Sequence, residues 1–260
     1  QGVFPANGSL GRNMGITHNY FSVDARVTRR FRLGERVRLD VIAEGFNLFN
    51  RFNEAAATFA LMSASYPRDP ALHYDLGNAL LKSGELGRAS AAYQRAFDLD
   101  PRDADIRRNL DFALKRAGEE LTPPGIPPLA FAAFTALSAR ELSGLHWAAA
   151  WLTLILAGII ALLGRRRTKL TSPLTLATAA WIVFGLWWTG LRAALPPGRG
   201  VITAGRAELR NGPGERFSVG YTAPEGRRVR VLSESGQWLE IGLLKEGVRG
   251  WILAASVERL

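Results

Sequence analysis

The chain has 260 residues, a formal net charge of +10 and no cysteine. The lack of cysteine excludes disulfide bonds, thiolate zinc sites and cysteine nucleophiles. The basic residues are dispersed, with no basic run longer than three residues, which argues against a nucleic-acid-binding protein. Beside long apolar segments, a basic excess is more typical of a membrane protein, in which it sets topology and attracts anionic lipids.

The N-terminal part of the chain, residues 1–53, alternates between apolar and polar residues in two stretches, 21–27 and 37–43, on either side of a Leu-Gly-Glu turn at 33–35. This pattern predicts a β-hairpin. Together with the Glu-Gly-Phe-Asn-Leu-Phe-Asn-Arg sequence at 44–51, it resembles the penultimate strands of TonB-dependent outer-membrane receptors, which implies lipid-facing barrel strands. The plug, most strands and the terminal strand of that family are absent, so no pore can form.

This N-terminal segment conflicts with the rest of the chain. Barrel strands must reach the outer membrane of a bacterium, whereas helices as apolar as those predicted below lodge in the inner membrane. We therefore interpret residues 1–53 as a chimeric join that, if it folds, forms a marginal hairpin. The chain begins at Gln1 without a signal-peptide pattern, so we expect it to be a piece of something longer or a processed product.

Residues 54–121 are rich in alanine and leucine with helical periodicity, and they contain an internal repeat. The Pro-Arg-Asp sequence at Pro67 recurs at Pro101, a spacing of 34 residues, which is the tetratricopeptide (TPR) period. Small and large residues occupy the positions at which TPR helices interdigitate: Leu76, Gly77, Leu80, Ala89, Tyr93, Ala96 and Pro101. This segment therefore resembles the TPR family.

A TPR unit over residues 70–103 implies two helices that cross closely at the small Gly77, with Tyr93 filling the gap beside it. Only half-units flank this unit: residues 54–66 resemble a second helix, and residues 104–118 resemble a first helix that acts as a C-terminal cap. About three repeats are usually needed for stability. We therefore expect helices to be missing upstream of this region, or another element to cover that end.

Acidic and histidine residues give no sign of a metal or catalytic centre. Four aspartates are dense enough to suggest a calcium loop, but the glycine and terminal glutamate of that motif are missing. We interpret them as the polar turn between repeats and a helix N-cap: Asp98, Asp100, Asp103 and Asp105. The histidines lie in three different zones of the chain: His18, His73 and His146. Without a phosphate loop either, the sequence predicts neither an enzyme nor a bound cofactor.

Two apolar runs, Leu145 to Leu163 and Leu174 to Leu191, follow a proline-rich linker at 122–144. The first run has 19 residues and spans about 28 Å as a helix, close to the hydrocarbon thickness of a bilayer. Because neither run has a polar face, we predict a transmembrane helical hairpin over residues 145–191. The apolar stretch at 129–137 is too short to span, and it belongs either to the membrane interface or to a plain linker.

The loop between the two runs decides the predicted orientation. It carries four basic residues within a few positions: Arg165, Arg166, Arg167 and Lys169. The positive-inside rule places such a loop in the cytoplasm. The segments on both sides of the hairpin are therefore predicted to face the periplasm.

Residues 200–260 are rich in Gly, Val and Trp, and their turn signals predict five short strands. The Leu-Arg-Asn-Gly-Pro-Gly loop at 209–214, the Glu-Gly turn at 225–226, and the Gly-Gln-Trp and Gly-Trp-Ile sequences that follow resemble bacterial SH3 domains. The resemblance implies a small all-β barrel that binds peptides, cell-wall material or partner proteins. The candidate ligand surface comprises Arg210, Pro213, Trp238 and Trp251. We expect at least one of the two tryptophans to fill the core of the barrel.

The predicted fold class is mixed multidomain: a β-hairpin, α-helical TPR repeats, two transmembrane helices and a small all-β SH3-like barrel. This domain order resembles that of the E-type proteins of the bacterial aerotolerance (Bat) operon. The resemblance implies an inner-membrane adaptor for stress tolerance, with membrane-anchored von Willebrand A-domain proteins and a MoxR-type ATPase as partners. Two alternatives stay open: a fragment of a TonB-dependent receptor, and an envelope module that binds peptidoglycan.

Overall fold

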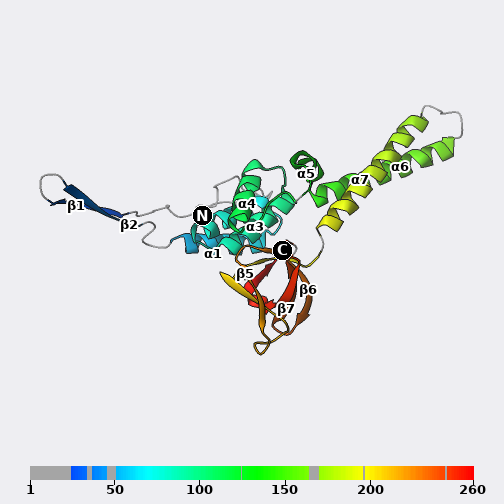
Figure 1. Ribbon diagram of the computed structural model, residues 1–260. Coiled ribbons are helices and arrows are strands. Elements are labelled where there is room, and N and C mark those ends of the chain that lie inside the picture. Colours follow the sequence, from blue (N-terminus) through cyan, green and yellow to red (C-terminus); the bar gives the residue numbers. More distant parts are fainter. Residues whose placement is uncertain are drawn as a thin grey trace.

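The computed structural model describes residues 25–33, 37–45, 51–123, 125–163, 170–195, 197–243 and 245–260. Within these ranges the helical repeat region and a C-terminal β domain lie side by side, and a long helical hairpin extends from them (Figure 1). A separate β-hairpin projects on the other side. The predicted mixed fold class is therefore confirmed.

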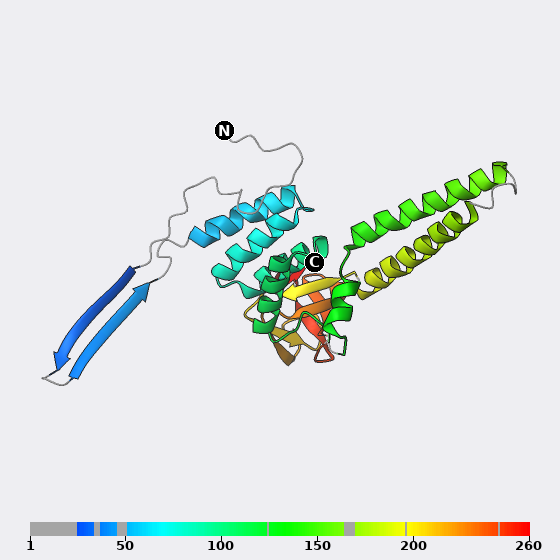
Figure 2. The ribbon, with the colours of Figure 1, turned by 90° about the horizontal axis from the view of Figure 1, so that it is seen from above.

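The N-terminal hairpin consists of β1 (Ala25–Leu33) and β2 (Val37–Gly45). The strands are antiparallel, with Leu33 opposite Val37 next to the turn and Ala25 opposite Gly45 at the far end. Figure 2 shows the hairpin reaching away from the other elements. A two-stranded hairpin that packs on nothing else is at best marginally stable in water. Most of the first predicted strand, residues 21–24, lies outside the described residues.

The repeat region contains four helices: α1 (Arg51–Ser65), α2 (Pro70–Lys82), α3 (Leu86–Leu99) and α4 (Ala104–Arg116). Aspartate side chains cap the N-termini of two of these helices, α2 and α4. Asp69 accepts a hydrogen bond from the N–H of Ala71 at 2.9 Å, and Asp103 accepts from the N–H of Asp105 at 2.8 Å. Asp103 thus acts as the expected N-cap, because its carboxylate satisfies backbone donors that have no partner within the helix.

The repeat core depends on a close approach of α2 and α3. A Cβ atom on Gly77 would lie 2.6 Å from ring atoms of Tyr93, a distance that side chains do not tolerate. Tyr93, Ala89 and Ala96 are completely buried at this crossing. The repeat pattern therefore has a steric cause. The ring of Tyr93 on α3 lies directly against α2, and only a glycine at position 77 leaves room for it.

Two long apolar helices, α6 (Ala139–Leu163) and α7 (Thr171–Ala194), form an antiparallel hairpin. Each is long and apolar enough to cross a membrane, by length and composition alone. Only 11% of each apolar window is buried in the protein, and large side chains such as Trp151 and Leu154 are mostly exposed. Helices in the core of a water-soluble protein bury such surface instead. The basic loop at 164–169 lies outside the described residues.

A histidine lies at the contact between these two helices. A Cβ atom on Gly185 would lie 2.9 Å from the ring of His146, so the glycine makes room for the imidazole. Nδ1 of His146 is 3.3 Å from the carbonyl oxygen of Trp181, and Nε1 of Trp181 donates to Nε2 of His146 at 3.4 Å. The imidazole thus has polar partners inside the hairpin, as groups in an apolar environment require.

A short helix, α5 (Pro128–Phe134), occupies the apolar stretch for which an interfacial or linker position was predicted. Its Phe131 packs against the core of the repeat region. The carbonyl oxygen of Phe134 accepts a hydrogen bond of 2.9 Å from Nε1 of Trp187 on α7. The stretch therefore forms a short helix that connects the repeat core to the helical hairpin.

The described part of the C-terminal domain has seven strands: β3 (Arg199–Ile202), β4 (Arg206–Arg210), β5 (Val219–Pro224), β6 (Arg228–Ser235), β7 (Trp238–Leu243), β8 (Val248–Leu253) and β9 (Val257–Arg259). Their order in the sheet is β5-β4-β8-β7-β6-β3-β9. Five strands were expected; the additional ones are β3 and β9, which pair with each other. Each has only three or four residues, too few to produce an alternating pattern.

Candidate functional site

The most extensive contact between domains runs along α3. One side of this helix, which carries Ala89 and Tyr93, packs in the repeat core. Its other side carries Gly87, Ser90 and Ala91, which are also buried. A Cβ atom on Gly87 would lie only 2.2 Å from the carbonyl oxygen of Ile202, so the helix touches the backbone of the β domain at that point. The helix is buried on both sides because the β domain covers the side that the repeats leave free.

Ion pairs fasten this contact at its edges. Nη2 of Arg199 lies 2.6 Å from a carboxylate oxygen of Asp98, and Nη1 of Arg95 lies 2.5 Å from one of Glu258. The four side chains are each between about one-fifth and one-third exposed. Asp98 thus belongs to the domain contact rather than to the polar turn between repeats that was predicted for it.

The Glu-Gly turn of the β domain makes further contacts with the repeat region. Oε1 of Glu225 accepts a hydrogen bond of 2.7 Å from the N–H of Gly87, at the start of α3. Glu119, which follows the last repeat helix, accepts from both Nε and the backbone N–H of Arg228, at 2.5 and 2.9 Å. Arg227 also donates to the carbonyl oxygen of Gly118 at 2.9 Å. This turn therefore forms part of the contact with the repeat region.

The opposite side of the repeat region, between α2 and α4, carries a hydrogen-bonded group of side chains. Oδ1 of Asn78 accepts from the hydroxyl of Tyr93 at 2.8 Å and from Nδ2 of Asn109 at 2.9 Å. Asn109 also donates to the hydroxyl of Tyr74 at 3.2 Å. Burial raises the pKa of the Tyr93 phenol well above its usual range, so the hydroxyl stays a donor. We call this surface the α2–α4 face.

An exposed aromatic ring extends the α2–α4 face. Phe112 is 49% exposed, and the guanidinium of Arg116 lies 5.6 Å from the centre of its ring. A half-exposed ring beside amide groups and a cation provides both apolar contact area and hydrogen bonding for a peptide. The packing residues predicted from the repeat pattern are all buried: Leu76, Gly77, Leu80, Ala89, Tyr93, Ala96 and Pro101.

The two tryptophans of the predicted ligand surface lie on adjacent strands. Leu239 and Ile241 of β7 point into the core of the β domain, so strand alternation turns Trp238 to the outer face of the sheet. Trp251 lies opposite Glu240 on that same face. Trp238 is only 9% exposed, but it lies on the outer face and outside the central apolar cluster, so it does not fill the core of the barrel as we expected for one tryptophan. Trp251 is half-buried and accessible.

The other two predicted surface residues belong to the loop after β4. Arg210 pairs with Trp251 in the sheet and forms an ion pair of 2.7 Å with Glu208. It also donates to the carbonyl oxygens of Glu215 and Phe217 at 2.9 Å each, which holds the loop in place. Pro213 is exposed at the loop tip. The guanidinium of Arg210 is therefore largely engaged in contacts within the domain, whereas Pro213 is available to a ligand.

The contact between the domains is not predicted by the sequence patterns, because each pattern describes one domain by itself. A signal was present in α3, where Gly87, Ser90 and Ala91 place small residues on the side that faces away from the repeat core. An exposed helix surface usually carries long polar side chains. Small residues there indicate a second packing partner, but they do not identify it. The predicted basic cluster of the loop, residues 165–169, lies outside the described residues.

Comparison with protein families agrees with two of these domains. The model for the bacterial SH3 domain matches residues 205–258, and a TPR repeat model matches residues 77–118. The search of curated proteins gave no match. The chain therefore contains a TPR repeat and a bacterial SH3 domain, which suggest binding of proteins or of peptidoglycan.

Proposed function

We propose that this protein is a membrane-anchored adaptor. In this role it binds one partner on the α2–α4 face of its TPR helices and another on the outer face of its SH3 domain. The role is binding rather than catalysis.

The observation that carries the proposal is the fixed arrangement of the two domains at one end of the helical hairpin. Contacts such as Arg199–Asp98 and Arg228–Glu119 hold the SH3 domain against α3. The α2–α4 face and Trp251 stay accessible. Two binding faces in a constant relative position hold two bound partners at a defined distance, so that an encounter between these partners becomes intramolecular.

We further propose that α6 and α7 span the inner membrane of a bacterium, with the loop at 164–169 in the cytoplasm and both domains in the periplasm. The small buried share of both helices and the exposed tryptophans support the anchoring. The basic loop residues support the orientation through the positive-inside rule.

The domain order supports a finer proposal, that the chain acts like the E-type proteins of the Bat operon. Its partners would then be von Willebrand A-domain proteins and a MoxR-type ATPase system.

We further propose that residues 1–53 are a chimeric segment similar to a TonB-dependent receptor. Sequencing the DNA around codon 54 tests this proposal, since a native gene would read through this junction without a break.

The adaptor proposal is tested by crosslinking in bacterial membranes. A photoreactive amino acid replaces Phe112 on the α2–α4 face or Trp251 on the SH3 face, and crosslinked proteins are identified by mass spectrometry. The proposal expects different, reproducible partners at the two positions. The control position is Gln237, which is exposed in the turn between β6 and β7. The same background at all three positions would contradict the adaptor role.

A second candidate function is binding of peptidoglycan by the SH3 domain. The observation that favours it is the accessible Trp251, which lies in the sheet beside Arg210 and Glu240. An aromatic ring flanked by both charges suits a sugar–peptide ligand. Sedimentation of the full chain in detergent with purified sacculi tests this function. Retention that the Trp251→Ala variant loses would support it, whereas no retention of the wild type would contradict it.

The receptor-fragment alternative has a separate test. Density-gradient fractionation of the membranes separates the inner from the outer membrane. The adaptor proposal expects the chain in the inner-membrane fraction. Recovery in the outer-membrane fraction would contradict the adaptor proposal and favour the receptor fragment.

A further inference from the structure

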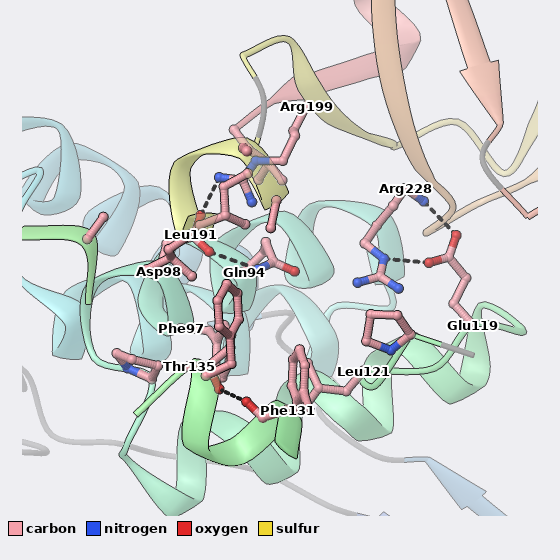
Figure 3. A pocket seen from close by; sticks show the side chains of 18 of the residues that line it. Gln94, Phe97, Asp98, Glu119, Leu121, Phe131, Thr135, Leu191, Arg199 and Arg228 are labelled. Atoms are coloured by element: carbon pink, nitrogen blue, oxygen red, sulfur yellow. Dashed lines mark hydrogen bonds and ion pairs between the residues drawn. The ribbon is translucent and has the colours of Figure 1, made fainter. Parts of the chain in front are cut away.

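A cavity of about 670 Å³ lies where the repeat helices, α5, the last turn of α7 and the SH3 domain meet (Figure 3). Much of its lining is aromatic or aliphatic, including Phe97, Leu121, Phe131, Leu137 and Leu191. The last turn of α7 is where that helix would leave the hydrocarbon region of a bilayer. The cavity therefore lies at the level of the lipid headgroups, with an apolar wall that continues into a transmembrane helix.

A buried polar atom in the lining has no partner. Gln94 is only 6% exposed, and its Nε2 donates to Oδ1 of Asp98 at 3.0 Å. Its Oε1 forms no hydrogen bond with any described residue, and Figure 3 shows this oxygen turned away from Asp98. An acceptor left without a partner in a buried position costs free energy. A hydroxyl donor on a ligand in the cavity would remove this cost.

Basic side chains outnumber acidic side chains in the lining of the cavity. Four basic residues line it, and two of them, Arg199 and Arg228, are paired with carboxylates. Among the described residues, the exposed Arg230 has no carboxylate partner, and Lys245 donates to the carbonyl oxygen of Gly118 at 2.6 Å. Against these two cations stands the exposed Glu120. Arg230 and Lys245 can therefore face an anionic group, such as a phosphate, in the cavity.

We propose that this cavity holds one anionic phospholipid with a hydroxylated headgroup, of the phosphatidylglycerol type, taken from the surrounding bilayer. Its acyl chain lies against Phe131 and Leu191, its phosphate faces Arg230 and Lys245, and a headgroup hydroxyl donates to Oε1 of Gln94. The lipid fills the junction between the TPR helices, the SH3 domain and the membrane helices. It therefore stabilises the position of both domains relative to the membrane. The inference rests on the membrane anchoring proposed above.

The experiment uses the full chain in nanodiscs that contain equal amounts of phosphatidylcholine and phosphatidylglycerol. The chain is then released from the nanodiscs, and native mass spectrometry counts the lipid molecules that stay bound to it. We expect one phosphatidylglycerol per chain, retained over phosphatidylcholine by about tenfold. The Arg230→Gln variant lowers this preference by about fivefold or more. Arg206→Gln is the matched control, because Arg206 is another exposed strand arginine of the same domain and does not line the cavity.

Two outcomes would overturn the inference. One is equal retention of both lipids by the wild type, and the other is the same preference in Arg230→Gln and Arg206→Gln. A third variant, Ala194→Trp, fills the mouth of the cavity from an exposed position on α7 and should abolish retention. Retention that persists in this variant would also contradict the assigned position.

A separate arm distinguishes failure of the lipid site from failure of the anchoring. Resistance of the chain to carbonate extraction from membranes measures anchoring alone. If the chain is extracted, the anchoring proposal fails, and the cavity is then tested with water-soluble dihexanoyl phosphatidylglycerol. Binding of this lipid, but not of glycerol 1-phosphate, would support an acyl-binding cavity. No binding of the short-chain lipid would overturn the inference.

Discussion

One carboxylate oxygen of Glu119 lies 2.5 Å from Nε of Arg228, and the other accepts the backbone N–H of the same arginine at 2.9 Å. Glu119 follows the last TPR helix, and Arg228 is the first residue of β6 in the SH3 domain. Only 8% of the glutamate side chain is exposed. Two hydrogen bonds to one buried carboxylate give the domains a defined relative orientation, which a flexible linker alone would not.

Glu119→Gln should weaken the whole protein as well as the contact between the domains. The amide has the size of the carboxylate but no charge, and its NH₂ group cannot accept a hydrogen bond from Arg228. We expect the free energy of unfolding to decrease by about 1–3 kcal/mol, measured by chemical denaturation in detergent. The control is Glu234→Gln, whose pair with Arg259 is about half exposed and should contribute less than about 1 kcal/mol. Equal losses in both variants would contradict this account.

Gly87→Ala tests the backbone contact between α3 and the SH3 domain. Alanine favours an isolated helix by about 1 kcal/mol over glycine. Here its Cβ atom would lie 2.2 Å from the carbonyl oxygen of Ile202, so the SH3 domain has to move. We expect faster proteolysis of the linkers and a lower melting temperature. Gly144→Ala on α6 is the control, since nothing lies within 4 Å of the added atom. If Gly87→Ala is as stable as this control, the domains are not in direct contact.

Gly77→Ala should disrupt the TPR core because its Cβ atom would overlap the ring of Tyr93. We expect a loss of about 1–3 kcal/mol in the free energy of unfolding. Truncating the facing side chain in the double variant Gly77→Ala, Tyr93→Ala removes the overlap, because the ring atoms nearest to the added Cβ atom are then gone. The combined cost should then be smaller than the sum of the two single costs. Additive costs would show that the two residues do not meet.

The stability of the repeat region should depend on pH through His73. This side chain is buried, and burial lowers the pKa of its imidazole below 6.5 despite a hydrogen-bonding distance of 3.0 Å between Nε2 and the carbonyl oxygen of Pro67. The unfolded chain therefore binds the proton more tightly than the folded chain. The stabilisation is complete above about pH 6.5 and decreases as the pH falls below it.

Thermal unfolding between pH 7.5 and pH 5 measures this effect. The wild type should lose up to about 1.4 kcal/mol per pH unit from this one proton. His73→Gln keeps a donor for the carbonyl oxygen of Pro67 but does not titrate, so its stability should change less over the same range. A parallel decrease in both proteins would assign the pH dependence to other groups.

The sequence predicted those features that follow from local pattern. The spacing from Pro67 to Pro101 revealed the repeat, and the small size of Gly77 followed from the crossing of two helices. Contacts between distant segments left no comparable pattern. The local pattern around Asp98 predicts a turn residue, because its partner in the structure, Arg199, is 101 positions away in the sequence. The two shortest strands of the SH3 domain were missed because they are recognised by their pairing and not by their residue types.

The central claim is that the TPR and SH3 domains lie on the same side of one membrane. The chain lacks cysteine, so single cysteines can be introduced at the exposed Arg68 in the TPR region, at Gln237 in the SH3 domain and at Thr168 in the loop between the spans. A membrane-impermeant maleimide is then added to spheroplasts. The account predicts labelling of Arg68→Cys and Gln237→Cys from outside, and of Thr168→Cys only after lysis. Labelling of the two domains from opposite sides would contradict it.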